Sequence, residues 1–405
     1  MRYPYQLSYR DILEDIVRKL TLVDYLKCRQ ICRSWRGTID DALSTKRTPS
    51  CLHASQFPFL MLFPHTFMYN CPQDPAISAI LSDITQEDTS YTIPTKTWEG
   101  YFDFEGLYVT SVQGWLVFRK MEYQSLLLFF TNPMSGEGFL LPHLPLFSGQ
   151  ENISNYNHIY NYSKNYSYKS INTSVKLIFS SAPYFSDFLV VAFAQVQCGT
   201  AQQLAFWKAN DKSWTLISNK ESQQKNFNEF VILDWKLYAM NTSGSVFVFD
   251  LRDSNNITFE KLQLEKIPKG TDNSRQTCML ARDKDEILLV HHFYDTICET
   301  TKGFRVFKLD ISGSRWIEVD DLGDRILLMD YTGVQVLSAK KIKLRGELNG
   351  GNFVFFVDDP FMLREQYDFG VFSLKDKTIT RFPLGRSSQG RIIRCLWFMV
   401  EEQDS

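Results

Sequence analysis

The chain has 405 residues, which suffices for one small module and one large domain. Lysine and arginine number 44 against 46 aspartates and glutamates, so the formal net charge is −2. This balance argues against a nucleic-acid partner, which would call for a basic surface. The eight cysteines are scattered without a Cys-x-x-Cys pair, which favours free thiols in a reducing compartment over a disulfide framework.

The N-terminus begins MRYPYQLSYRD and lacks the apolar core of a signal peptide. No stretch of the sequence approaches the ~20 apolar residues that a membrane span needs. We therefore expect a soluble protein of the cytoplasm and/or the nucleus, without a membrane partner.

Two short helices are predicted within the first forty-odd residues. Ser8 precedes Asp11 by three positions, and Thr21 precedes Asp24 in the same way, which is the spacing of a helix N-cap. Apolar residues recur at helical spacing behind each cap and end in the run ICRSW (residues 31–35). A unit this small cannot bury so much apolar surface alone, so it needs a partner.

Residues 9–39 resemble an F-box, the helical module by which substrate receptors dock on the Skp adaptor of cullin-based ubiquitin ligases. The resemblance implies an apolar set that faces the adaptor. This set is Leu7, Ile12, Leu13, Ile16, Leu26, Ile31 and Trp35. F-boxes usually open with Leu-Pro, whereas here Leu7 is followed by Ser8, which caps a helix without fixing φ in advance. The alternative is an ordinary helical hairpin packed on its own domain.

The domain boundaries follow from this resemblance and from composition. We assign residues 1–45 to the F-box, 46–57 to a connector that contains Pro49, and 58–400 to a β-rich body.

From about residue 57 onward, short apolar runs replace the helical period. Five units share one order, in which two strand-like runs are followed by a polar turn and a third run. They begin at GWLVF (114–118), FLVVAF (188–193), KLYAM (236–240), EILLV (286–290) and NFVFFV (352–357). Further β-like runs between the units, such as VKLIFSS, EFVILD and RILLMD, bring each unit to about four strands. Repeats of this size predict the blades of a β-propeller.

A sixth unit combines PFLMLF (58–63) with YTIP (91–94), and IIRCLWFM (392–399) is a candidate for the strand that closes the ring. The predicted fold is therefore mainly β: an N-terminal helical F-box followed by a β-propeller of about six blades. Five or seven blades stay open because terminal units are the least regular. An irregular β-sandwich is the alternative, and it does not explain the repeated order.

The body also resembles the plant F-box proteins that carry a KIB-like β-propeller domain. The most specific matches are GFRVF (303–307), LGDR (322–325) and GVF (370–372). Weaker matches include LYA (237–239) and VFDL (248–251).

Two segments have open interpretations. Residues 148–174 form an Asn/Tyr/Ser tract, which is typical of a mobile loop between blades and alternatively of a Tyr-rich recognition loop. The basic cluster Lys340, Lys341, Lys343 and Arg345 favours a solvated strand edge, with a nuclear signal as the alternative.

No catalytic, cofactor or metal site is predicted. His291 and His292 are adjacent, so on a strand their side chains point to opposite faces and cannot easily share a metal. The acidic pairs 320–321 and 358–359 are typical of turns, and Asp324 with Arg325 of a structural pair or an exposed turn.

The most consistent function is the substrate receptor of an SCF-type (Skp-cullin-F-box) ubiquitin ligase. Its F-box would bind the Skp adaptor, and through it the cullin, while the propeller would present an unknown protein substrate. Two other classes stay open: a propeller binding protein with a degenerate F-box, and a propeller enzyme acting on a small metabolite.

Overall fold

The computed structural model is almost entirely β. It describes residues 59–64, 78–82, 90–94, 108–122, 125–132, 137–146, 173–181, 183, 186–196, 202–217, 226–265, 275–295, 300–341, 350–358, 368–382 and 392–398, with the helical residues 16, 35 and 37. Within these residues the remaining regular structure is β-strand, apart from the 3₁₀ helix η4 (Ala339–Lys341). The mainly β prediction for the body is confirmed.

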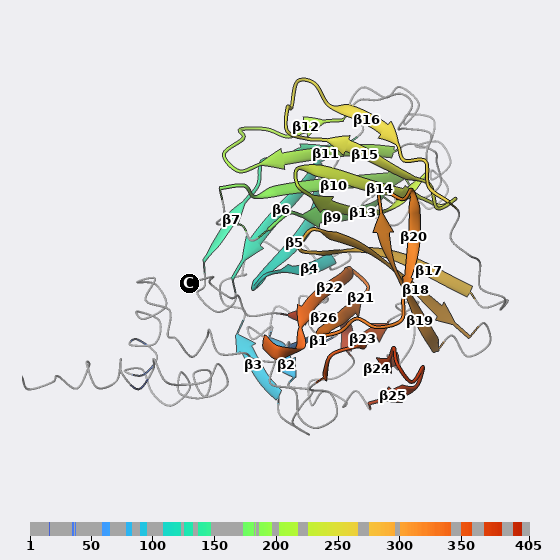
Figure 1. Ribbon diagram of the computed structural model, residues 1–405. Coiled ribbons are helices and arrows are strands. Elements are labelled where there is room, and N and C mark those ends of the chain that lie inside the picture. The colour runs from blue at the N-terminus through green and yellow to red at the C-terminus, as the bar shows by residue number, and fades with distance from the viewer. Residues whose placement is uncertain are drawn as a thin grey trace, which may run out of the picture.

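The described strands form six sheets, which we number in chain order (Figure 1). Sheet 1 contains β1 (Phe59–Pro64), β2 (Ser78–Ser82), β3 (Ser90–Pro94) and β26 (Ile392–Phe398). Sheet 2 contains β4 (Tyr108–Val112), β5 (Trp115–Glu122), β6 (Ser125–Thr131), β7 (Gly138–Leu140) and β8 (Leu144–Pro145). Sheet 3 contains β9 (Thr173–Phe179), β10 (Leu189–Val196), β11 (Gln202–Lys208) and β12 (Thr215–Leu216).

The other three sheets follow in the same manner. Sheet 4 contains β13 (Phe227–Leu233), β14 (Lys236–Asn241), β15 (Val246–Asp250) and β16 (Thr258–Lys261). Sheet 5 contains β17 (Arg275–Asp283), β18 (Glu286–Tyr294), β19 (Thr301–Asp310) and β20 (Arg315–Val319). Sheet 6 contains β21 (Arg325–Asp330), β22 (Gly333–Ser338), β23 (Phe353–Asp358), β24 (Asp368–Ser373) and β25 (Ile379–Arg381).

Each central sheet is buried on both faces because its strands alternate between two cores. In β14, Leu237 and Ala239 pack into the cluster shared with sheet 3, whereas Tyr238 and Met240 pack into the cluster shared with sheet 5. Successive side chains on a strand point to opposite faces, so a strand between two cores must be apolar at every position. This requirement explains the continuous apolar runs in the sequence and gives the stacked sheets of a propeller.

The first and last strands of the body close the arrangement. β1 pairs with β26 in antiparallel register, with Phe59 opposite Phe398, so the predicted closing strand is confirmed. In Figure 1 this sheet, which begins in blue, lies beside the orange strands of sheet 6. The Trp397 backbone N–H donates to Asp330 Oδ2 at 2.9 Å, and the Trp397 carbonyl accepts from Ser111 Oγ at 2.5 Å. One residue of sheet 1 therefore ties sheets 6 and 2 together.

Sheet 6 differs from sheets 3, 4 and 5, in which consecutive strands pair. Its strand order is β22-β21-β23-β24-β25, and β21 runs parallel to β23. The run NFVFFV, expected as a second strand, is thus the third strand of the sheet. The strand GVQVLS (β22) was not predicted, because Gln335 and Ser338 interrupt its apolar run, and it lies at the sheet edge that packs against β17.

The structure also corrects the predictions for the basic cluster and for the Asn/Tyr/Ser tract. Lys340 and Lys341 lie in η4 and not on a strand edge, while Lys343 and Arg345 lie outside the described residues. Of the predicted loop 148–174, residues 173 and 174 belong to β9, and the rest lies outside the described part of the chain.

The buried carboxylate of Asp330 gives a test of ring closure. Its Oδ1 accepts from the Thr332 backbone N–H at 2.8 Å and its Oδ2 from the Trp397 N–H. We expect Asp330→Asn to lower the free energy of unfolding by about 2 kcal/mol, because an amide nitrogen then faces a buried N–H donor. Urea unfolding followed by fluorescence measures this, with the exposed Asp253→Asn as the control. Equal unfolding free energies for the two variants would contradict the role of Asp330.

Candidate functional site

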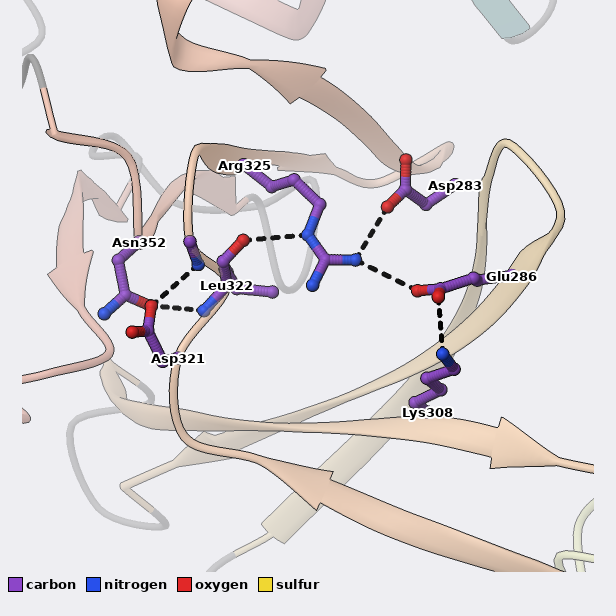
Figure 2. Close-up of polar contacts among 8 residues, drawn as sticks. Asp283, Glu286, Lys308, Asp321, Leu322, Arg325 and Asn352 are labelled. Atoms are coloured by element: carbon purple, nitrogen blue, oxygen red, sulfur yellow. Dashed lines mark hydrogen bonds and ion pairs between the residues drawn. The ribbon is translucent and has the colours of Figure 1, made fainter.

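The segment LGDR (322–325) lies at the junction between sheets 5 and 6, and Figure 2 shows its polar contacts. Arg325 Nη1 lies 2.7 Å from Asp283 Oδ2 and 3.1 Å from Glu286 Oε2. Glu286 also pairs with Lys308, and the hydrogen bond from this lysine is the main reason why the pKa of Glu286 is lowered. The charges at this junction therefore neutralise one another and join two sheets.

The residues that lead into β23 contact the same LGDR segment. Asn352 Oδ1 accepts from the Leu322 N–H at 2.9 Å, and the Asn352 N–H donates to the Arg325 carbonyl at 2.7 Å. Gly351 has φ +76°, and a Cβ on it would lie 2.3 Å from the Gly323 carbonyl oxygen. Backbone therefore packs directly on backbone here, which only glycine permits.

Three acidic residues that the sequence predicts in turns or in a structural pair have different outcomes. Asp321 Oδ1 accepts from the Gly323 N–H at 2.7 Å, so it is a turn-forming aspartate as expected. Asp324 bonds to Ser338 Oγ at 2.6 Å, while Arg325 binds other carboxylates, so the two residues serve different neighbours. Asp358 is not in a turn, because it is the buried last residue of β23.

A second polar cluster links three successive sheets through β9, β13 and β17. Lys176 Nζ lies 2.5 Å from Glu229 Oε1, and Glu229 Oε2 accepts from the Leu280 N–H at 3.3 Å. Burial raises the pKa of Glu229, and the charge of Lys176 opposes this rise. The adjacent Cys278 is a free thiol whose pKa is raised to about 11 by burial and by Glu229. A thiol with this pKa is mostly protonated at neutral pH and is a weak nucleophile.

The two adjacent histidines lie on opposite faces of β18, as predicted. His291 packs beside Phe307 at a centroid distance of 5.0 Å, whereas His292 stacks on Phe304 at 4.6 Å. The Nε2 atom of His292 lies 2.9 Å from Thr301 Oγ1. Burial lowers the pKa of His291 to about 4 and that of His292 to about 3, so both are neutral at physiological pH.

These arrangements are structural in their chemistry. Glu229, Glu286 and Arg325 each have partners within the fold, and the two histidines sit among aromatic rings. Within the residues that the structure describes, no group of three or more His, Cys, Asp or Glu side chains is placed to hold a metal ion. None of these clusters assembles a nucleophile with an adjacent base, which covalent chemistry would require.

Two family models match this chain, one in its N-terminal part and one in its β-rich body. A model of the KIB1-4 beta-propeller matches residues 83–373, and a model of the F-box domain matches residues 10–47. The chain belongs to the KIB1-4 β-propeller family and carries an F-box domain. The resemblance drawn from LGDR and the other segments is therefore confirmed.

Relatives of this KIB1-4 β-propeller protein occur in Arabidopsis thaliana. One, named "Putative F-box protein", is 23% identical over 343 residues, which cover 81% of this chain and 78% of the relative. Another, named "F-box/kelch-repeat protein", is 30% identical over 174 residues, which cover 40% of this chain and 41% of the relative. Among solved structures, TolB from Acinetobacter baumannii is 11% identical, with a TM-score of 0.43 over 91% of this chain and 73% of TolB. That likeness is too weak to support any inference.

Within the described residues, no helix has the length and apolar character that crossing a membrane requires.

The predicted adaptor-facing residues are only partly described. Ile16 is helical with 40% of its surface exposed, and Trp35 is helical and partly buried. Leu7, Ile12, Leu13, Leu26 and Ile31 lie outside the described residues. Lys176, Glu229 and Asn352 were not among the residues predicted from the sequence. A charged residue inside an apolar run, as in VKLIF and NEFVIL, is the signal that would have found the first two.

The two neighbouring glycines at the sheet 6 junction give a matched test. We expect Gly351→Ala to lower the free energy of unfolding by about 2–4 kcal/mol, because a Cβ meets backbone atoms at a positive φ. Gly350→Ala should change it by less than about 0.5 kcal/mol, since nothing lies within 4 Å of its Cβ. Chemical denaturation of both variants measures the difference. Similar losses of unfolding free energy for the two variants would show that the backbone at Gly351 has room for a Cβ beside the Gly323 carbonyl.

The lowered pKa of His292 predicts a pH dependence of stability. Below the unfolded value of 6.5 the unfolded chain takes up a proton that the folded His292, with a pKa of about 3, does not. The free energy of unfolding should therefore fall as the pH drops from 6.5 towards 3, by up to about 1.4 kcal/mol per pH unit for this group.

His292→Gln removes this dependence. The difference in unfolding free energy between wild type and variant should shrink by about 1–2 kcal/mol between pH 6.5 and pH 5. Leu216→Gln, at a site that is 41% exposed and has no titratable group, serves as the control and should give a constant difference. Parallel curves for His292→Gln and wild type would contradict the burial of a neutral imidazole.

Proposed function

We propose that the protein is the substrate receptor of an SCF-type ubiquitin ligase. The observation that carries the proposal is the match to an F-box at residues 10–47 and to a KIB1-4 beta-propeller at residues 83–373 in one chain. F-box domains bind the Skp adaptor in SCF complexes, so the N-terminal module would recruit the adaptor and, through it, the cullin. The propeller would then hold a protein substrate.

The mechanism of such a receptor is positional. Holding a substrate lysine near a charged thioester raises its effective concentration, so no residue of this chain forms or breaks a covalent bond. The packing of the propeller supports this role, because apolar clusters and the partly buried Lys176–Glu229 pair hold neighbouring sheets together.

We propose that the adaptor binds the apolar set predicted from the sequence. This set is Leu7, Ile12, Leu13, Ile16, Leu26, Ile31 and Trp35. The 40% exposure of Ile16 within the chain fits contact with a second protein. We also propose that the six sheets are six blades of one ring, and that the protein acts in the cytoplasm and/or the nucleus.

A second function is favoured by one observation. Leu7 is followed by Ser8 where the family pattern has proline, which removes a residue that fixes the first helical turn. A chain with a degenerate F-box would act as a propeller binding protein outside any ligase.

Adaptor binding distinguishes the two. Residues 1–405 are co-expressed with a plant Skp adaptor, and the complex is isolated by affinity purification and gel filtration. We expect a stoichiometric complex for wild type and none for the double variant Ile31→Asp/Trp35→Asp, which places two charges in an apolar contact.

The matched control for this test lies on the propeller. Ile317→Asp introduces the same charge at a site that is 41% exposed, and it should leave the adaptor complex intact. Circular dichroism confirms that each variant keeps its β-structure. A folded wild-type chain that elutes without adaptor would favour the propeller binding protein, and a double variant that still binds would exclude Ile31 and Trp35 from the contact.

A further inference from the structure

The turn between β13 and β14 carries a conformational outlier. Leu233 pairs with Lys236, so Asp234 and Trp235 form a two-residue turn, with φ of 50° and 60°. Turns of this kind favour glycine and asparagine, because a Cβ is strained in the left-handed region. In the equivalent turn of sheet 2, the position of Trp235 is taken by Gly114 at φ 83°. Turn geometry therefore does not account for an indole here.

The indole is held in place while part of it stays exposed. Trp235 packs on the edge of the core cluster between sheets 3 and 4, and its carbonyl accepts from the Leu251 N–H at 2.9 Å. The ammonium of Lys208, from sheet 3, lies 5.5 Å from the indole centroid. An aromatic ring fixed in advance at a turn tip loses little entropy on binding, which is typical of an interface anchor.

The two cations around the ring, Arg252 and Lys208, differ in their ion pairs. Arg252 lies 2.7 Å from Asp234 Oδ2 and 3.2 Å from Asp250 Oδ2, so its charge is neutralised. Lys208 Nζ instead donates to the Arg252 carbonyl at 2.9 Å. Within the described residues, no carboxylate forms an ion pair with Lys208. The four charges of Asp234, Asp250, Arg252 and Lys208 sum to zero, and the turn offers an apolar ring beside the one cation that forms no ion pair with the described residues.

We propose that this turn is a protein-binding surface, with Trp235 as its anchor and Lys208 as its charge. Its partner is a protein segment that carries an apolar side chain next to a carboxylate, which complements the ring and the ammonium. That this partner is the protein to be ubiquitinated rests on the proposed function, whereas the surface itself does not.

A photo-crosslinking probe tests the surface in the full chain. The exposed Asp253, next to Arg252, is replaced by p-benzoylphenylalanine, and the exposed Asp285 in the next sheet is replaced in a control chain. Both are irradiated in plant extract, and the protein captured at position 253 but not at 285 is purified. Its Kd is then measured for wild type and variants. Absence of any capture specific to position 253 would overturn the proposal.

The variants separate binding from folding. Trp235→Gly gives the turn the residue that sheet 2 already uses, so it should fold, yet we expect the Kd to rise by at least about tenfold. Trp235→Phe keeps an aromatic ring and should raise the Kd by less than about threefold. Lys208→Gln should weaken binding and reduce its dependence on salt. Lys284→Gly, which removes a side chain at φ 51° from the next sheet, is the matched control and should leave the Kd unchanged.

Two further readouts keep this proposal distinct from the ligase role. An unchanged Kd for Trp235→Gly would show that the indole only covers the core edge, and would overturn the surface. Adaptor co-purification and ubiquitination of the captured protein are followed in the same samples. A captured protein that binds through Trp235 but is not ubiquitinated supports the surface and contradicts the substrate-receptor role.

Discussion

The fold depends on the burial of each central sheet between two neighbours. A four-stranded sheet with apolar side chains on both faces is not stable alone, because one face or the other would meet water. Here β14 and β18 each send alternate residues into two different clusters, so sheets 4 and 5 each contribute to two cores. Each sheet therefore needs a neighbouring sheet to cover its apolar face, and sheet 6 packs against sheet 1. Pairing of β26 with β1 satisfies this need, because the first sheet then has a partner strand from the end of the propeller.

Three of the polar groups in this apolar arrangement connect neighbouring sheets. Glu229 accepts from Lys176 on one side and from the Leu280 backbone on the other, and so links three sheets. Arg325 and Asp330 do the same at the two ends of β21, through carboxylates of sheet 5 and the backbone of sheet 1. Burying these charges is unfavourable by itself. Their value lies in specificity, because each bond forms in only one relative position of the sheets.

A rigid propeller of this kind suits a receptor whose work is to hold one protein near another. The F-box match and the propeller match cover separate residues of one chain, which is what the proposed receptor role requires. Within each of the two charged clusters, the side chains pair with one another inside the fold. The indole of Trp235 and the ammonium of Lys208 are instead partly exposed. Lys208 also joins two sheets, because its ammonium donates to the Arg252 carbonyl that follows β15 in sheet 4.

The sequence by itself determined the fold class of the short N-terminal module and of the long β-rich body. Helical spacing with caps marked the F-box, and the repeated order of apolar runs marked the strands, because both follow from local periodicity. It also placed His291 and His292 on opposite faces and identified IIRCLWFM as the closing strand. Only the tertiary structure decided which strand lies where in sheet 6, since the parallel pairing of β21 with β23 joins two strands that are not consecutive in the chain. The partners of Glu229, Arg325 and Lys208 likewise came from other sheets, and such long-range contacts leave no periodic signal in the sequence.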